Sequence, residues 1–425
     1  MKNISKYNYL LIGVGCFMLI GLMCLTYSKF SYQRSLSGSI ITYKTPTFSE
    51  ILIAAARSNL DTNVNFASPS SSTNGIGLMM RDGTQNDEYP IVYYRGDVSN
   101  NNVIYADLCW LIVRTTETGG IKLVFNGPVV ENADGTESCT NYSGVGGVTA
   151  NSNYTDVYAG NTATVFNAKS DSPVYVGYMY NATNKFYSSN TLDGAGYIAH
   201  LSDNSVIENG LDSETGRHTQ NKTDSTVKGV VDAWYEENIK GKPEESLLED
   251  TIWCNDRSVI SETYSIENYA TNTSFSFAAY TRVVDNSPKT PSLICSRDMD
   301  KFTVESENGN GDLDYPIGML TADEILMAGN SYTSSENTYL SLTLENYLWS
   351  LSPTHFKSGN ARVFIVQTSY LGHSYSTALR GARPAISLSN SAIVSDGNGS
   401  FTSPYLVGWF PDTFRKIIIN KWKKD

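Results

Sequence analysis

The sequence predicts an α+β fold in which an antiparallel, β-rich core is flanked by two or three helices. Of its 425 residues, 28 are Tyr and 33 are Gly, which is typical of many short strands joined by turns. Apolar residues make up 40% of the chain and charged residues only 17%, so the chain can build a core. Hairpin patterns and helix patterns occur together within one body, which is the arrangement of α+β folds.

Several segments have the pattern of strands. Apolar and β-branched residues on both sides of TETGG predict a hairpin with strands Val103–Thr115 and Ile121–Asn126, turning at Gly119 and Gly120. Residues 174–180, VYVGYMY, predict a short aromatic strand. Three further β segments are expected near the end of the chain, namely YLWSLSP, ARVFIVQTSY and GARPAISL.

Three helices are expected. Thr47 and Glu50 have capping-box spacing at the start of a short helix, and Thr321 and Glu324 have the same spacing before ILMAG. The clearest amphipathic helix is DSTVKGVVDAWYEENIKG, which should end at Gly241. Its apolar face consists of Val227, Val230, Val231, Trp234 and Tyr235.

A hydrophobic segment near the N-terminus predicts a membrane anchor. Lys2 and Lys6 precede an uncharged stretch over 7–27, which as a helix would be about 31 Å long and match the hydrocarbon core. A cleaved signal peptide would begin in the same way. The run is long for a signal peptide and no small-residue cleavage site closes it, so an uncleaved signal anchor is favoured.

The predicted anchor determines the expected order of segments along the chain. Residues 1–6 are predicted to be cytoplasmic, 7–27 transmembrane, 28–75 a juxtamembrane stalk with a short helix, and 76–408 an extracellular domain. Residues 409–425 form a basic amphipathic tail, which would contact a membrane surface or partner, or else pack on the domain. The expected location is the cell membrane, with a single span and the bulk of the chain outside.

The cysteines favour the outside location. Cys109, Cys139, Cys254 and Cys295 are an even set in the body without the spacing of a zinc site. Pairing of nearest neighbours would close two loops worth about 3–4 kcal/mol each. The two other connectivities remain open at this point, as does a reduced, cytosolic body.

Charge excludes one class of partner. The net charge is −12, and the last fourteen residues carry +3, so the rest carries −15. Such a body repels phosphate backbones, and we expect no nucleic-acid binding.

The order of motifs resembles a known group of proteins. The motifs, in their order along the chain, are CWLIVRTTETGGIKLVFNG, TVKGVVDAWY, DTIWCNDRS, YPIGMLTADEILMAG, WSLSP and RPAISL. Over about residues 90–408 the chain resembles uncharacterised Firmicute surface proteins rich in Tyr, Asn and Gly. It is more distantly similar to the formylglycine-generating-enzyme and C-type-lectin-like superfamily. The resemblance implies a C-type-lectin-like core of twisted antiparallel strands.

The resemblance also assigns roles. In C-type-lectin-like folds late loops and strands form the ligand surface, which implies contacts from Arg362, Tyr370, His373 and Tyr375. A structural role is implied for Trp110, Trp234, Trp349, Pro353, Arg383 and Pro384.

Catalysis is not expected. Formylglycine-generating enzymes bind copper through two cysteines near the C-terminal end, whereas residues 296–425 contain none. His200, His218, His355 and His373 are too far apart in sequence to indicate a site, and no GxSxG or HExxH motif occurs. We therefore expect no catalytic residue and no cofactor.

A weak calcium candidate lies in ESENGNGDLDYP, where Asn308, Asn310, Asp312 and Asp314 offer oxygen ligands. The loop lacks the glutamate that an EF-hand requires, and a Gly-mediated turn is favoured instead.

The expected function is that of a non-catalytic surface protein, held in the lipid bilayer by residues 7–27, that binds a glycan, a peptide or a surface polymer. The alternatives are a self-associating structural envelope protein and, less favoured, an enzyme on this scaffold. A binding protein should expose aromatic residues near 360–380, and an enzyme should gather groups with shifted pKa values in one pocket.

Overall fold

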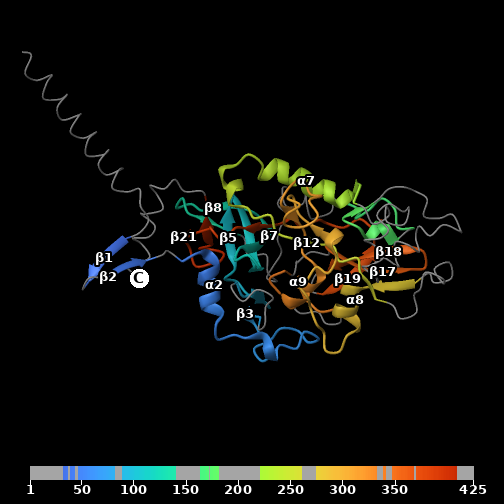
Figure 1. The fold of residues 1–425 in the computed structure, drawn as a ribbon, viewed down its shortest axis with the longest axis horizontal. Helices are drawn as coiled ribbons and strands as arrows, with labels where there is room; N and C mark the ends of the chain where they lie inside the picture. The colour runs from blue at the N-terminus through green and yellow to red at the C-terminus, as the bar shows by residue number, and fades with distance from the viewer. Residues whose placement is uncertain are drawn as a thin grey trace, which may run out of the picture.

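The computed structural model describes residues 32–36, 39–43, 46–81, 89–139, 163–171, 173–180, 221–260, 274–332, 338–340, 347–367 and 370–408. The predicted anchor, the basic tail, His200 and His218 lie outside these residues. Within the described ranges, no helix has the length and apolar character needed to cross a bilayer. The body is α+β, with mostly sheet and few helices, as the sequence predicts (Figure 1).

A nine-stranded sheet forms one half of the body. Its strands pair in antiparallel fashion, except β22 with β5, which are parallel. The order is β16 (Ile317–Gly318), β20 (Ala385–Leu388), β7 (Ile121–Pro128), β6 (Leu108–Thr115), β5 (Asn102–Tyr105), β22 (Tyr405–Val407) and β21 (Val394–Asp396), with β4 (Val92–Arg95) pairing β6 and β3 (Gly77–Met80).

A five-stranded antiparallel sheet forms the other half. Its order is β13 (Val259–Ile260), β14 (Ser274–Phe277), β17 (Leu348–Lys357), β18 (Asn360–Val366) and β19 (Leu371–Tyr375). All three predicted C-terminal β segments are confirmed. Two of them form β17 and β18, while the third forms β20 in the larger sheet. Figure 1 shows the two sheets towards opposite ends of the body, with the helix α9 between them.

The remaining elements are short. The two-stranded pairs are β1 (Tyr32–Leu36) with β2 (Ser39–Tyr43), β8 (Val130–Glu131) with β9 (Glu137–Ser138), β10 (Met179–Tyr180) with β11 (Thr223–Asp224), and β12 (Trp253–Cys254) with β15 (Lys301–Phe302). The single turns of helix are η1 (Asp61–Asn63), η2 (Pro173–Val176), η4 (Pro243–Leu247), η6 (Thr281–Asp285), η7 (Asp298–Asp300) and α8 (Ala278–Tyr280).

The strand predicted over 174–180 is wrong for its first half. Residues 173–176 form the turn η2, closed by a hydrogen bond of 2.9 Å from Gly177 N to Val174 O, and only Met179 and Tyr180 are extended. Apolar aromatic runs this short do not separate a strand from a buried turn.

The predicted hairpin is present, but its first strand divides in two. Gly119 adopts a positive φ in the turn between β6 and β7, as expected. Residues 103–115, predicted as one strand, form β5 and β6, because Ala106 and Asp107 both have positive φ. Two such residues make a tight hairpin turn, which the sequence does not signal because Ala is an unusual choice there.

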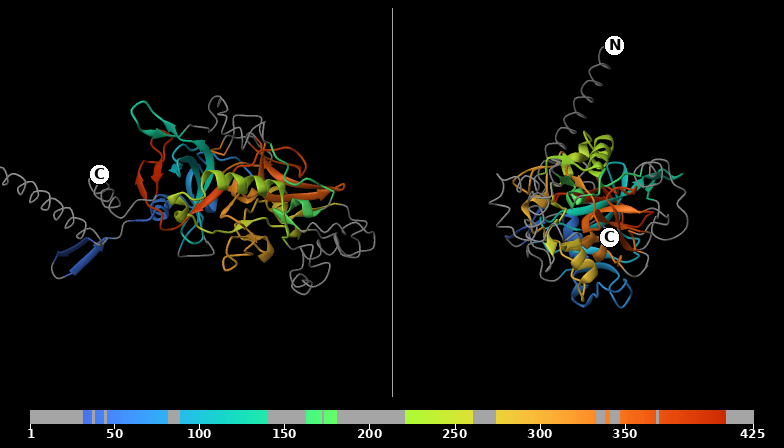
Figure 2. Two further views of the ribbon diagram at one scale, coloured as in Figure 1. Left: turned by 90° about the horizontal axis from the view of Figure 1, so that it is seen from above. Right: turned by 90° about the vertical axis from the view of Figure 1, so that its right-hand side faces the viewer.

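The amphipathic helix predicted before Gly241 is α7 (Thr226–Asn238), which runs along the outside of the body (Figure 2). The Ser225 side chain accepts a hydrogen bond from Lys228 N and caps the helix. Val227, Val231, Trp234 and Tyr235 are buried as predicted. The Trp234 ring packs edge-on against Trp110 of β6, with centroids 5.8 Å apart, and so fixes α7 on the larger sheet.

Both predicted capping boxes are confirmed, in α2 (Phe48–Ala56) and α9 (Ala322–Met327). Helix α2 falls in the segment predicted as a stalk, yet Phe48 and Leu52 belong to the same hydrophobic core as the two sheets. Phe48 N also donates to Ala392 O, at 3.1 Å. This part of the segment is therefore packed with the body, because the helix has an apolar face that must be buried.

The four body cysteines form two disulfides, Cys109–Cys139 and Cys254–Cys295. This is the nearest-neighbour pairing, which the sequence could not separate from the two alternatives. The first disulfide ties β6 to the chain after β9, and the second ties β12 to the segment before η7. The fold thus satisfies the requirement that the Cα atoms lie close, here 5.7 and 5.6 Å apart.

Candidate functional site

Three of the four predicted ligand contacts meet on one face of the smaller sheet. The register places Arg362 of β18 opposite His355 of β17 and also opposite Tyr375 of β19. Directly opposed residues in antiparallel strands share a face, so these side chains form a row across three strands. His373 opposes Phe364 and belongs to the next row on the same face.

Arg362 organises this row, which we call the β17–β19 face. Its guanidinium lies 4.4 Å from the centre of the Tyr375 ring, and its Nη2 donates to the Tyr375 hydroxyl at 3.1 Å. Its Nη1 donates to His373 Nε2, also at 3.1 Å. The Tyr375 ring nevertheless remains 45% exposed. A surface aromatic ring held by a cation–π contact and a hydrogen bond loses little further freedom when it binds a ligand.

The two histidines of this face are uncharged. Burial, the neighbouring His373 and Arg362 lower the pKa of His355 to about 3. Burial and Arg362 also lower the pKa of His373. Arginine can only donate, so His373 Nε2 accepts and its Nδ1 carries the proton, which it donates to the Tyr332 hydroxyl at 2.8 Å. Arg362 is therefore the cation of the row at neutral pH.

Sequence reasoning missed three members of this cluster. The rings of His355 and His373 lie 4.8 Å apart, and Tyr280 of α8 packs against His355 and Tyr332. These residues are distant in sequence, so no spacing signals their approach. The predicted contact Tyr370 lies outside the cluster, at the turn end of the β18–β19 hairpin, whereas Tyr375 lies at its open end. It is exposed there, like Tyr375.

A second site, which sequence reasoning did not find, is a cavity of about 370 Å³ between the larger sheet and α9. The β6–β7 hairpin contributes Arg114, Thr118 and Lys122 to its wall. Chain 249–252 and the Cys254–Cys295 disulfide form another side. Asp323 and Glu324 enter from α9, and Arg282 enters from η6. We call this the charged cavity.

Glu324 joins two buried cations in its wall. Its Oε1 accepts from Arg114 Nε at 2.8 Å and from Lys122 Nζ at 2.9 Å, and all three side chains are at most 5% exposed. Burial would raise the pKa of Glu324, but Lys122 and Arg114 outweigh it and hold the pKa at about 2. The Lys122 ammonium also lies 4.3 Å from the centre of the Trp253 ring. Glu117, whose Oε1 lies 3.2 Å from Arg114 Nη1, supplies a second carboxylate, so two cations face two carboxylates in this group.

Arg282 binds two further carboxylates of the cavity, those of Asp323 and Asp256. It forms a two-pronged pair with Asp323, at 2.8 Å from Nε and Nη2, and donates from Nη1 to Asp256 at 2.8 Å. Ser292 N donates a further hydrogen bond to Asp323, at 2.9 Å. The Asp250 carboxylate, which also lines the cavity, accepts hydrogen bonds from Val304 N, Glu305 N and the Asn308 side chain.

Glu249 differs from the other acids of the cavity. Its two carboxylate oxygens accept from the hydroxyls of Thr116, at 2.9 Å, and Thr118. Among the described residues, no cation pairs with it. Burial raises its pKa, and the two hydroxyls oppose that rise. Gly120 permits this position, because a Cβ there would lie 2.2 Å from Glu249 Oε2.

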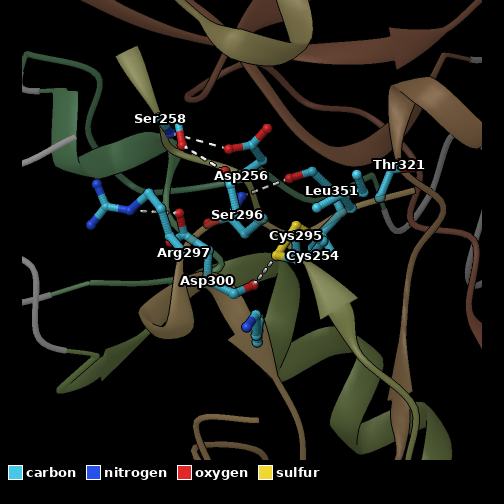
Figure 3. Close-up of a disulfide and its surroundings, with 12 residues drawn as sticks. Cys254, Asp256, Ser258, Cys295, Ser296, Arg297, Asp300, Thr321 and Leu351 are labelled. Carbon is cyan, nitrogen blue, oxygen red and sulfur yellow. Dashed lines mark hydrogen bonds and ion pairs between the residues drawn. A yellow bond between two sulfur atoms is a disulfide. The ribbon is translucent and has the colours of Figure 1, made fainter. Parts of the chain in front are cut away.

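The second disulfide lies in the wall of the cavity, and Figure 3 shows it next to Asp300. Cys295 Sγ lies 3.4 Å from the carbonyl oxygen of Asp300, whose side chain receives Arg257 Nε at 2.5 Å. Asp300 and Arg257 are both at most 1% exposed, so the disulfide rests on a buried ion pair.

The four weak calcium candidates form hydrogen bonds or close contacts with different partners. Asn308 donates to Asp250, Asp312 accepts from Asn221, and Asn310 bonds to the backbone of Thr303, Asp312 and Met299. Asp314 meets Asp224 and Asp232 of the α7 region, with carboxylate oxygens within 4.8 Å of one another. The calcium assignment stays a prediction that no observation on this structure tests.

The ammonium of Lys228 occupies the centre of the Asp224, Asp232 and Asp314 group, at 3.3, 2.7 and 2.9 Å from their oxygens. Its side chain is fully buried. Burial disfavours the charge, but hydrogen bonds to Asp232 and Asp314 outweigh it and raise the lysine pKa. A side-chain cation therefore neutralises the acids that would otherwise suit a metal ion.

Lys228→Ala is expected to lower the free energy of unfolding by about 2 kcal/mol, because charged hydrogen bonds are lost and three carboxylates repel one another. Millimolar Ca²⁺ should restore part of this loss, since oxygen ligands then surround an empty centre. Denaturant unfolding with and without Ca²⁺ measures both effects. Lys240→Ala, which removes an exposed pair with Glu236, is the matched control and should change little. Equal stabilisation of both variants by Ca²⁺ would contradict the expectation.

The residues to which the resemblance gave a structural role lie in the interior. Trp110, Trp234 and Trp349 are at most 6% exposed, and Trp349 Nε1 donates to Thr164 O at 2.9 Å. Arg383 donates to Phe125 O and Asn126, and so joins β20 to β7. Pro353 lies at an irregularity in the pairing of β17 with β18, and Pro384 is also buried.

Comparison with protein-family models, with curated proteins and with solved structures found no match to this chain. The class of this protein is therefore defined by its fold and its two candidate sites. It is a disulfide-linked, β-rich α+β protein with an ordered aromatic face and a separate charged cavity.

Proposed function

We propose that this chain is a non-catalytic binding protein, anchored in the cell membrane by residues 7–27, with a C-type-lectin-like domain outside the cell. The ligand is a glycan, a peptide or a surface polymer. Support for the location comes from the uncharged stretch near the N-terminus and from two disulfides, which persist in oxidising compartments.

One observation carries the binding function: Arg362 holds the Tyr375 ring in place while almost half of that ring stays exposed. Exposed aromatic rings with fixed orientation are typical anchors of binding surfaces. The neighbouring imidazoles are neutral, so the face combines aromatic surface with a single guanidinium. That combination suits a polar ligand that stacks on the ring and accepts hydrogen bonds from Arg362.

The charged cavity bears on the enzyme alternative, because it gathers groups with shifted pKa values. Glu324, Lys122 and Asp323 have opposite charges beside them, which gives a structural reason for their presence that requires no catalytic role. Binding through the β17–β19 face is therefore the better supported function.

Full-length protein in detergent micelles should bind members of a glycan and peptide array more strongly than a denatured sample. Tyr375→Ala is expected to weaken that binding at least about tenfold, because truncation of an aromatic anchor usually costs more than 1 kcal/mol. Tyr370→Ala is the matched control, as it removes an equally exposed tyrosine of the same hairpin outside the cluster. Absence of any signal above the denatured sample, or equal losses in both variants, would count against the proposal.

A further inference from the structure

The lining of the charged cavity has six carboxylates and four cations, and among the described residues one of these carboxylates has neither a cation nor an N–H donor beside it. Arg114 and Lys122 are held by Glu324, and Arg282 by Asp323 and Asp256. Lys301 at the rim pairs with Asp298, and Glu117 pairs with Arg114. Asp250 receives three N–H donors. Within the described residues this leaves Glu249, which has only hydroxyl partners.

Glu249 and two hydroxyls form a compact set of acceptors. Thr116 Oγ1 lies 2.9 Å from the carboxylate and 3.1 Å from Thr118 Oγ1, and Thr118 also touches the carboxylate. Gly120 N donates to Thr116 Oγ1 at 2.8 Å and fixes that hydroxyl in the hairpin turn. Thr116 is fully buried and positions the carboxylate, whereas Glu249 and Thr118 line the cavity. A primary ammonium group has three N–H donors in a compact head, which matches a carboxylate with a hydroxyl oxygen beside it.

From this arrangement we infer that the charged cavity binds a small polar molecule that carries a primary ammonium group, with the ammonium at Glu249 and Thr118, the two members of the set that line the cavity. A cavity of about 370 Å³ lies in the size range of small-molecule sites. A divalent metal fits less well, because Ca²⁺ requires six to eight oxygens and the nearby Asp250 carboxylate is occupied by N–H groups. This inference concerns a different site from the β17–β19 face and does not depend on ligand binding there.

Binding of two probe amines, ethanolamine and cadaverine, to the full-length protein in micelles tests the inference by calorimetry at pH 7. N-acetylethanolamine and N,N′-diacetylcadaverine are the matched neutral probes and should bind at least about tenfold more weakly. Glu249→Gln keeps the size of the side chain and removes its charge, and should weaken amine binding about ten- to hundredfold. Glu117→Gln removes a carboxylate of the same cavity that already has a partner, and should bind like the original protein.

A second variant tests the same site with a substitution that should leave the fold intact. Thr118→Val keeps the carboxylate, removes one hydroxyl at the exposed mouth and should weaken amine binding several-fold with an unchanged melting temperature. Equal affinity for amines and their acetylated forms would overturn the inference. So would amine binding that survives Glu249→Gln, or Ca²⁺ binding that depends on Glu249 without amine binding.

Discussion

Glu324→Gln is expected to lower the free energy of unfolding by about 3–5 kcal/mol, the usual consequence of removing one member of a buried ion cluster. The substitution leaves the Arg114 guanidinium and the Lys122 ammonium, which are at most 5% exposed, without their shared carboxylate. It also weakens the capping box of α9. Denaturant unfolding at pH 7 measures the loss.

Glu50→Gln is the matched control for the capping box, because Glu50 has the same role in α2 but is exposed. The difference between the two variants isolates the contribution of the buried ion cluster. Losses of equal size in both would contradict the assignment, since they would attribute the whole effect to helix capping.

The Glu324 carboxyl is also expected to make the free energy of unfolding depend on pH. The folded-state pKa of Glu324, about 2, lies below its ordinary value of 4.5, so the unfolded chain takes up a proton first. The stabilisation is complete above about pH 4.5 and is lost as the pH falls towards 2. The stability difference between the original protein and Glu324→Gln should therefore shrink over that window. A difference that stays constant from pH 7 to pH 3 would contradict the assignment.

Asp300→Asn is expected to have a similarly large effect, about 3–5 kcal/mol. Burial would raise the pKa of Asp300, but Arg257 and Arg297 outweigh it and lower the pKa, so the carboxylate is charged in the folded protein. The neutral amide would leave the fully buried Arg257 without its counter-charge. Thermal or denaturant unfolding measures the loss of stability.

Asp298→Asn provides the comparison, because Asp298 belongs to the same turn, η7, and is 90% exposed. A surface pair of this kind contributes little. A loss no larger for Asp300 than for Asp298 would show that the ion pair beneath the disulfide does not stabilise the fold.

Local features of this fold could be predicted from sequence. The two capping boxes, the buried face of α7 and the β6–β7 turn follow from residues only a few positions apart. Such features depend on backbone geometry and periodicity, which act within one element. The division of residues 103–115 at Ala106 and Asp107 was not predictable, because nothing about alanine indicates a positive φ.

The candidate sites depend on contacts between distant parts of the chain. Three members of the β17–β19 face, Arg362, His373 and Tyr375, were named through the resemblance, and the structure shows that they lie on one hairpin. The other members of this face arrive from α8, β17 and the chain after α9. Glu249 approaches the β6–β7 turn across more than a hundred residues, and only the packed structure reveals that its partners among the described residues are two hydroxyls and no cation.

By itself, the sequence determined the hydrophobic stretch at 7–27, the positions of the principal helices and strands, and an even set of four body cysteines. The tertiary structure decided which cysteines pair, that α2 packs with the body, and that the two sites exist. The physical reason is that helix and strand patterns repeat over two to four residues, whereas pairing, burial of charge and cavities arise where distant segments meet.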